Sequence, residues 1–192
     1  GADLCVRDGY AVNPGNAKTE LPKAVAAFRR AGLSVPMISL PTGLHNPDDP
    51  VAEVLFAACH DAGVPYLKPG YWGFRAGDFQ TQLDAARREL EGWQQLAKRF
   101  GVKCCVHTHS GNYLTVNASA SLLVVQGSDP AAIGMYLDPG HLALNGEPLT
   151  MAMTMAGKRL SILAIKDLMW ERVGGDAVRR VRCMPLGEGF VN

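Results

Sequence analysis

The sequence lacks concentrated charge and long apolar runs, and each absence narrows the possible functions. Lysine and arginine nearly balance aspartate and glutamate, which leaves a net charge of +1 without any basic run. We therefore do not expect a protein that binds nucleic acid through many phosphate contacts. No apolar stretch approaches the roughly 20 residues of a membrane span, so no membrane association is expected.

Paired cysteine motifs are also lacking. The five cysteines are Cys5, Cys59, Cys104, Cys105 and Cys183. Their number is odd, they form no CxxC motif, and Cys104 and Cys105 lie inside an apolar run. Free thiols in a reducing compartment explain this pattern best, so a cytoplasmic location is expected.

Six short apolar segments, rich in β-branched residues, recur at intervals of roughly 30 to 40 residues, the length of one βα unit. They predict strands at 3–6, 33–40, 64–69, 102–109, 133–138 and 161–167. Amphipathic patterns between them predict helices at 19–32, 48–63 and 78–101, with weaker patterns at 117–130 and 147–160. Alternating strands and helices predict a parallel sheet.

The loops favour a barrel over an open dinucleotide-binding sheet. The first strand–helix junction, "RDGYAVNPGNAKTE", lacks the GxGxxG of dinucleotide-binding folds. Long, polar, glycine-rich loops follow several other strands, as at the active face of a (β/α)8 barrel. A full barrel takes about 250 residues, so we predict a single domain, 1–192, of TIM-barrel type with about six βα units.

Groups able to bind a metal or move a proton follow the later strands. His107 and His109 end the fourth strand, Asp138 and His141 follow the fifth in "LDPGH", and Lys166 ends the sixth. Neighbouring strands lie about 4.8 Å apart, so the histidines and Asp138 could converge within one coordination sphere. Imidazole and carboxylate suit divalent metals such as zinc, manganese, iron or cobalt.

Each of these groups also has an ordinary structural explanation. The two histidines could be polar residues where a strand meets water, Asp138 could cap a turn, and Lys166 could pair with Asp167 at the surface. After the third strand, Lys68 is followed by Tyr71, Trp72 and Phe74. These aromatic residues could form a wall over a sugar or simply pack.

Four motifs agree in order and spacing with one known family. "GVKCCVHTHSGN", "IGMYLDPGHLALNGEP", "LAIKDLMW" and "MPLGEGFVN" resemble the sugar phosphate isomerase/epimerase family. These are xylose isomerase-like TIM barrels, related more distantly to endonuclease IV. The resemblance implies a divalent metal at the C-terminal face, held by a glutamate ending one strand, an aspartate in D-x-G-H, a histidine before K-D and a glutamate on the last strand. It also implies that the two glutamates act as acid and base.

The sequence departs from this pattern at several positions. Asp138 matches the aspartate and His141 its companion, but His107 stands at the position of the first glutamate. Ala164 replaces the histidine before Lys166. The last glutamate has no counterpart, and we expect a barrel that is incomplete at both ends.

We therefore hypothesise a sugar or sugar-phosphate isomerase/epimerase, with a sugar or sugar phosphate as partner and a homo-oligomer as a possible assembly. A divalent metal (Mn, Mg, Zn or Co) would be held by His107, Asp138 and His141, with His107 also serving as a base. Lys166 would neutralise the developing enediolate, and the substrate would contact Lys68, Trp72, His109 and His141. Two rivals stay open: a degenerate barrel that serves as a binding or assembly module without metal, and a metal-dependent nuclease.

Overall fold

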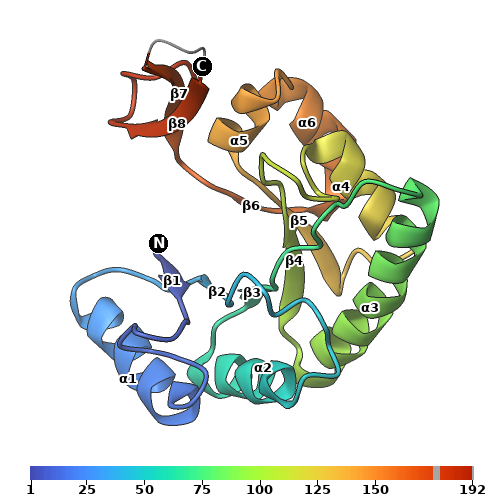
Figure 1. Ribbon diagram of the computed structural model, residues 1–192. Coiled ribbons are helices and arrows are strands. Elements are labelled where there is room, and N and C mark those ends of the chain that lie inside the picture. Colours follow the sequence, from blue (N-terminus) through green and yellow to red (C-terminus); the bar gives the residue numbers. More distant parts are fainter. Residues whose placement is uncertain (175–177, 192) are drawn as a thin grey trace.

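The computed structural model describes residues 1–174 and 178–191. Six parallel strands pair in chain order and curl into half of a barrel, with helices along the outer side (Figure 1). The strands are β1 (Asp3–Cys5), β2 (Met37–Ser39), β3 (Tyr66–Lys68), β4 (Lys103–His107), β5 (Ile133–Leu137) and β6 (Leu160–Leu163). The prediction of a TIM-barrel type with six βα units is confirmed. Within the described residues, β1 and β6 are the two edges of this sheet.

The helices that cover the outer side are α1 (Ala17–Arg30), α2 (Pro50–Ala62), α3 (Phe79–Phe100), α4 (Ala118–Val125) and α6 (Leu149–Ala156). The two ends of α3 show why sequence patterns predicted the positions of these helices well. The Asp78 side chain accepts hydrogen bonds from the backbone N–H groups of Gln80 and Thr81, and Gly101 closes the helix in a left-handed conformation. None of the described helices is long and apolar enough to cross a membrane.

Alternation along the strands separates two surfaces of the sheet. Residues such as Val6, Leu67, Val106 and Leu137 are buried against the helices in the main hydrophobic core. Their neighbours in sequence point to the barrel interior, because successive side chains of a strand point to opposite faces. A smaller apolar cluster of Met37, Cys105 and Tyr136, packed against Tyr66, Ile162 and Ala164, fills the lower part of that interior.

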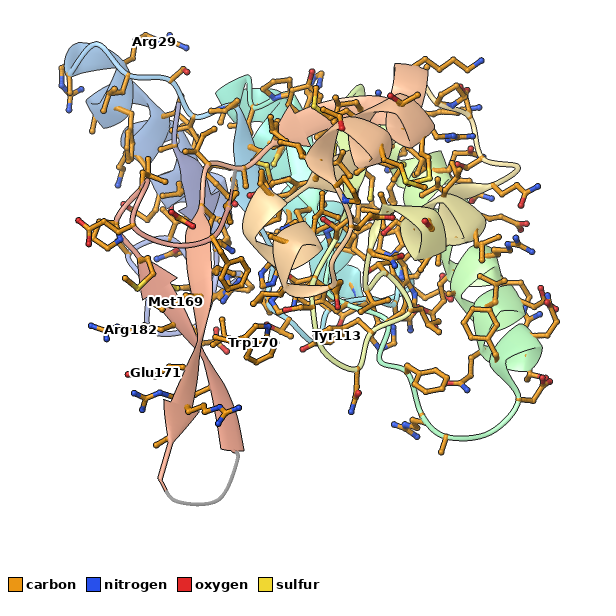
Figure 2. All side chains as sticks on the ribbon, turned by 90° about the horizontal axis from the view of Figure 1, so that it is seen from above. Arg29, Tyr113, Met169, Trp170, Glu171 and Arg182 are labelled. Carbon is orange, nitrogen blue, oxygen red and sulfur yellow. The ribbon has the colours of Figure 1, made fainter. Side chains whose placement is uncertain are left out.

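Two elements were not predicted from the sequence. Helix α5 (Pro139–Leu144) begins directly after β5, where a loop was expected. Strands β7 (Asp167–Val173) and β8 (Val178–Met184) form an antiparallel hairpin in place of a seventh barrel strand. Figure 2 shows this hairpin projecting from the body of the molecule, with Met169, Trp170, Glu171 and Arg182 along it.

The base of the hairpin is fixed by Asp167, which was considered above as a surface partner of Lys166. Its carboxylate instead accepts hydrogen bonds from the backbone N–H groups of Gly187, Gly189 and Val191 at 2.8 to 3.1 Å. The chain passes so close that a Cβ on Gly189 would collide with the Asp167 carboxylate. The "GEG" segment therefore serves to dock the end of the chain on β7.

Candidate functional site

The polar cluster lies where β4, β5 and β6 end. His107 is the last residue of β4, Asp138 follows β5 directly, and Lys166 lies three residues beyond β6. Since Val106 and Leu137 face the helices, His107 and Asp138 both face the barrel interior. The convergence that strand adjacency predicted is present, because His107 Nε2 lies 3.4 Å from Asp138 Oδ2.

Asp138 is the centre of the cluster and is fully buried. Its Oδ1 accepts the backbone N–H of His141 at 3.2 Å and so caps α5, which makes the capping explanation correct as well. Its Oδ2 lies 2.6 Å from Lys166 Nζ and 3.8 Å from His141 Nε2. Burial alone would raise the pKa of Asp138, but His107 and Lys166 together hold it well below its usual range. The group is therefore a carboxylate paired with an ammonium.

Neighbouring groups fix the proton positions on two of the histidines. Lys166 Nζ lies 3.2 Å from His141 Nε2, and since an ammonium only donates, this nitrogen accepts. The proton of His141 therefore sits on Nδ1, which donates to Ser110 Oγ at 2.8 Å. In His107, Nδ1 lies 2.8 Å from the Tyr71 hydroxyl. Because the Asp138 carboxylate that faces His107 Nε2 only accepts, the proton of His107 is on Nε2, and Nδ1 accepts from the Tyr71 hydroxyl.

His109 differs from these two histidines. Its Nδ1 donates to the backbone oxygen of Ser110 at 2.7 Å, because a carbonyl oxygen only accepts. The lone pair is consequently on Nε2, for which the described residues supply no hydrogen-bond donor. The His109 ring stacks on that of His141 with centroids 3.8 Å apart and is half-buried. His109 thus presents a neutral, unprotonated nitrogen to the cluster.

Burial keeps all three imidazoles neutral at physiological pH. It lowers the pKa of His107 to about 4 despite the nearby Asp138, and that of His141 to about 3. It lowers the pKa of His109 as well. The permanent charges of the cluster are therefore the carboxylate of Asp138 and the ammonium of Lys166.

The two predicted substrate residues after the third strand are placed very differently. Lys68 is 2% exposed and points to the interior, with its Nζ 3.9 Å from the centroid of the Tyr71 ring. Trp72 is buried in the helix-side core, where its indole N–H donates to Glu89 on α3 at 2.7 Å. The structure does not bring Trp72 to the cluster; the aromatic rings beside the histidines are those of Tyr71, Tyr113 and Tyr136.

The cluster does not fit the metal that the family resemblance implied. Buried His107 Nε2 and Asp138 Oδ2 face each other at 3.4 Å, as two ligands would. However, Lys166 Nζ lies against both Asp138 Oδ2 and His141 Nε2, so an ammonium occupies the place between these donors. No group of three or more histidine, cysteine, aspartate or glutamate side chains in the described parts of the chain is arranged to hold a metal ion. The ligand set of His107, Asp138 and His141 remains a prediction.

Comparison with known proteins places this chain in a family. Residues 4–192 match the family described as xylose isomerase-like TIM barrel. The chain belongs to that family. A search of curated proteins finds no match. Membership of the family establishes the fold of this chain, whereas its function depends on the residues of its own site.

Solved structures share the fold at low sequence identity. A D-tagatose 3-epimerase-like protein is 15% identical with a TM-score of 0.72, over 99% of this chain and 73% of its own. A probable 3-DHS dehydratase of Bacillus anthracis is 16% identical with a TM-score of 0.72, over 99% of this chain and 74% of its own. A mannonate dehydratase of Streptococcus suis is 12% identical with a TM-score of 0.68, over 100% of this chain and 70% of its own. This chain thus spans 70–74% of the length of these three proteins.

Proposed function

We propose that this xylose isomerase-like chain moves a proton at a carbon next to a carbonyl group in a small sugar derivative, as an isomerase or epimerase does. The observation that carries the proposal is the cluster at the ends of β4 to β6, in which a buried carboxylate–ammonium pair lies beside a neutral imidazole with a free lone pair. Structural relatives named as epimerases and dehydratases of sugars or sugar acids support the same substrate class.

Each residue of the cluster has a role that its contacts support. His109 Nε2 takes the proton from the carbon, because its tautomer leaves the lone pair available. The electron pair of the broken C–H bond moves onto the carbonyl oxygen, where Lys166 stabilises the enediolate charge. Asp138 holds Lys166 in place, and His141 accepts a second hydrogen bond from the same ammonium.

Return of the proton decides the product. Delivery to the opposite face of the same carbon inverts it, and delivery to the neighbouring carbon isomerises the sugar. His109, protonated at Nε2 by the first step, is the group that returns this proton to the neighbouring carbon, while the proton of the adjacent hydroxyl moves to the enediolate oxygen. His107, whose neutral Nε2–H faces Asp138, is a hydrogen-bond donor in the same cluster and gives up no proton. No redox partner is required, since one proton leaves and one returns.

Solvent isotope exchange tests the proposal. The protein is incubated in D2O with the neutral ketoses D-tagatose, D-psicose and L-ribulose, with the sugar acid D-mannonate and with a ketose phosphate, and deuterium incorporation next to the carbonyl or carboxyl carbon is followed by proton NMR. We expect exchange with at least one of these compounds and a loss of about 100-fold or more in His109→Gln, the range for a general base. His60→Gln is the matched control, because His60 lies at the end of α2 and contacts the Phe100 backbone oxygen.

The same assay distinguishes the alternatives. Exchange that survives treatment with EDTA supports the lysine-centred site, whereas exchange that EDTA abolishes and manganese, zinc or cobalt restores would establish His107, Asp138 and His141 as ligands instead. Folded protein that exchanges none of the compounds, with or without these metals, would refute the proposal and favour a binding module without catalysis.

A further inference from the structure

Two cations on the other side of the barrel interior, the buried Lys68 and the half-buried Arg7, have no role in the reaction just described. Lys68 ends β3 and Arg7 lies two residues beyond β1. The Nζ of Lys68 and the Nε of Arg7 are both buried, and neither forms a hydrogen bond within the described residues. A buried ammonium without an acceptor is costly, so a structure that keeps one calls for a partner.

Strand register places the two cations together. Cys5 pairs with Ser39 and Ser39 with Lys68, so the ends of β1, β2 and β3 lie in one row (Figure 1). The ladder continues past β1, because the backbone N–H of Val6 donates to the Ser39 oxygen at 2.9 Å. Val6 and Leu67 face the helices, so Arg7 and Lys68 both face the interior.

The acid beside these cations does not neutralise them through a direct contact. Asp3 accepts hydrogen bonds from Ser39 at 2.9 Å and from the Tyr136 hydroxyl at 3.4 Å. No ion pair joins it to Arg7 or Lys68 in the parts of the chain that the structure describes. Burial, and next the charge of Arg7, lower the pKa of Lys68 to about 7, although the nearby charge of Asp3 acts in the opposite direction.

We infer that Arg7 and Lys68 bind an anionic group of the substrate, a carboxylate or a phosphate, so that this protein acts on a sugar acid or sugar phosphate and not on a neutral sugar. The inference rests on the proposed function and names its substrate class. Guanidinium and ammonium are the usual partners of both anions.

Tyr71 connects this anion subsite to the reacting end of the site. One face of its ring lies against Lys68 Nζ, its hydroxyl meets His107, and its edge meets the His109 ring at a centroid distance of 4.8 Å. Tyr71 therefore lies between the cations and the proton-transfer groups, as does Tyr136, whose ring meets His107 and whose hydroxyl meets Asp3. That spacing suits a short-chain substrate with its anionic group at one end and its carbonyl at the other.

Calorimetric titration tests the inference without requiring turnover. The probes are inorganic phosphate, D-gluconate and the neutral D-sorbitol, which has the same carbon skeleton as gluconate. We expect phosphate or gluconate to bind at least tenfold more tightly than sorbitol, and Lys68→Met and Arg7→Met each to remove that preference. Lys158→Met is the control, because this lysine is exposed on the 3-10 turn before β6 and forms no ion pair in the described chain. The stronger anionic probe identifies the group as carboxylate or phosphate.

A structural role for Lys68 would give a different result. Lys68→Met removes an unpaired buried charge. In the absence of an anion, the unfolding midpoint of this variant should therefore be no lower than that of the unmodified protein. Addition of 10 mM of the anion that binds should stabilise the unmodified protein but not the variant. Lys68→Arg should retain part of the anion preference. Equal affinity for gluconate, phosphate and sorbitol, or anion binding that both methionine variants leave intact, would overturn the inference. If the protein binds anions through these residues but catalyses no isotope exchange, only the proposed function is refuted. If it exchanges a neutral ketose and shows no preference for anions, only the inference is refuted.

Discussion

Replacing Lys166 by methionine tests the electrostatic centre of the site. The change keeps most of the apolar stem of the side chain but leaves the buried carboxylate of Asp138 beside two neutral imidazoles. Removing one member of a buried ion pair costs about 3–5 kcal/mol. The Lys166 side chain is 35% exposed, so water screens part of this charge and we expect a loss of about 2 kcal/mol at pH 7.

The pH dependence of this loss identifies its cause. In the unmodified protein the pKa of Asp138 is lowered, so its contribution to stability is present above the unfolded pKa, about 3.9, and disappears as the pH falls through the folded pKa. In Lys166→Met, burial raises the pKa of Asp138, so the carboxyl takes up a proton as the pH falls and the penalty is relieved. The difference between the two proteins should therefore be largest at pH 7 and fall below about 1 kcal/mol near pH 4.

Urea denaturation followed by tryptophan fluorescence measures this difference. Lys158→Met, whose lysine is exposed on the 3-10 turn before β6, should stay within about 0.5 kcal/mol of the unmodified protein. A loss in Lys166→Met that is the same at pH 7 and pH 4 would show that packing, and not the ion pair, is responsible. A loss under about 0.5 kcal/mol at both values would refute the ion pair altogether.

Three further predictions follow from the fold and the site. Gly70→Ala should lower the free energy of unfolding by about 1–3 kcal/mol, because its Cβ would lie 2.7 Å from the backbone nitrogen of Leu44; Gly73→Ala, whose Cβ meets nothing within 4 Å, is the control in the same urea titration. The pKa values of His107 and His141 are lowered to about 4 and about 3, so neither histidine should titrate by NMR between pH 8 and pH 6. As the pH drops below about 6.5, each of these two histidines should lower the free energy of unfolding by up to about 1.4 kcal/mol per pH unit. The open edges of β1 and β6 predict concentration-dependent association in light scattering, and a monomer at every concentration would contradict this.

The sequence located the strands and their polar ends because both depend on local patterns. Apolar segments at regular spacing are sufficient to predict a parallel sheet, and adjacency of consecutive strands is sufficient to bring His107 and Asp138 together. The family resemblance predicted the barrel, which the structure confirms, and a substrate class that stays a proposal. These predictions required no knowledge of any long-range contact beyond the pairing of neighbouring strands.

Contacts between residues far apart in the sequence determine the features that the sequence did not predict. Trp72 turns away from the interior because the Glu89 carboxylate on α3 accepts its indole N–H, and no spacing along the chain encodes that choice. Lys166 reaches Asp138 because β6 ends at Leu163 and the chain crosses the barrel rim before Asp167 docks the hairpin. Arg7 was overlooked because a single arginine in a loop has no sequence signature, although alternation from the buried Val6 would have placed it in the interior.

The distribution of charge inside the half-barrel suggests which chemistry the site favours. The pair of Asp138 and Lys166 is neutral overall, and the histidines beside it stay uncharged because burial lowers their pKa values. An enediolate formed there adds one negative charge, which this neutral pair can accommodate only through the ammonium. Arg7 and Lys68 exceed the charge of Asp3, so an anionic group bound on that side balances the interior before the reaction begins. A substrate that carries its own charge would therefore leave Lys166 available for the charge that develops at the reacting carbon.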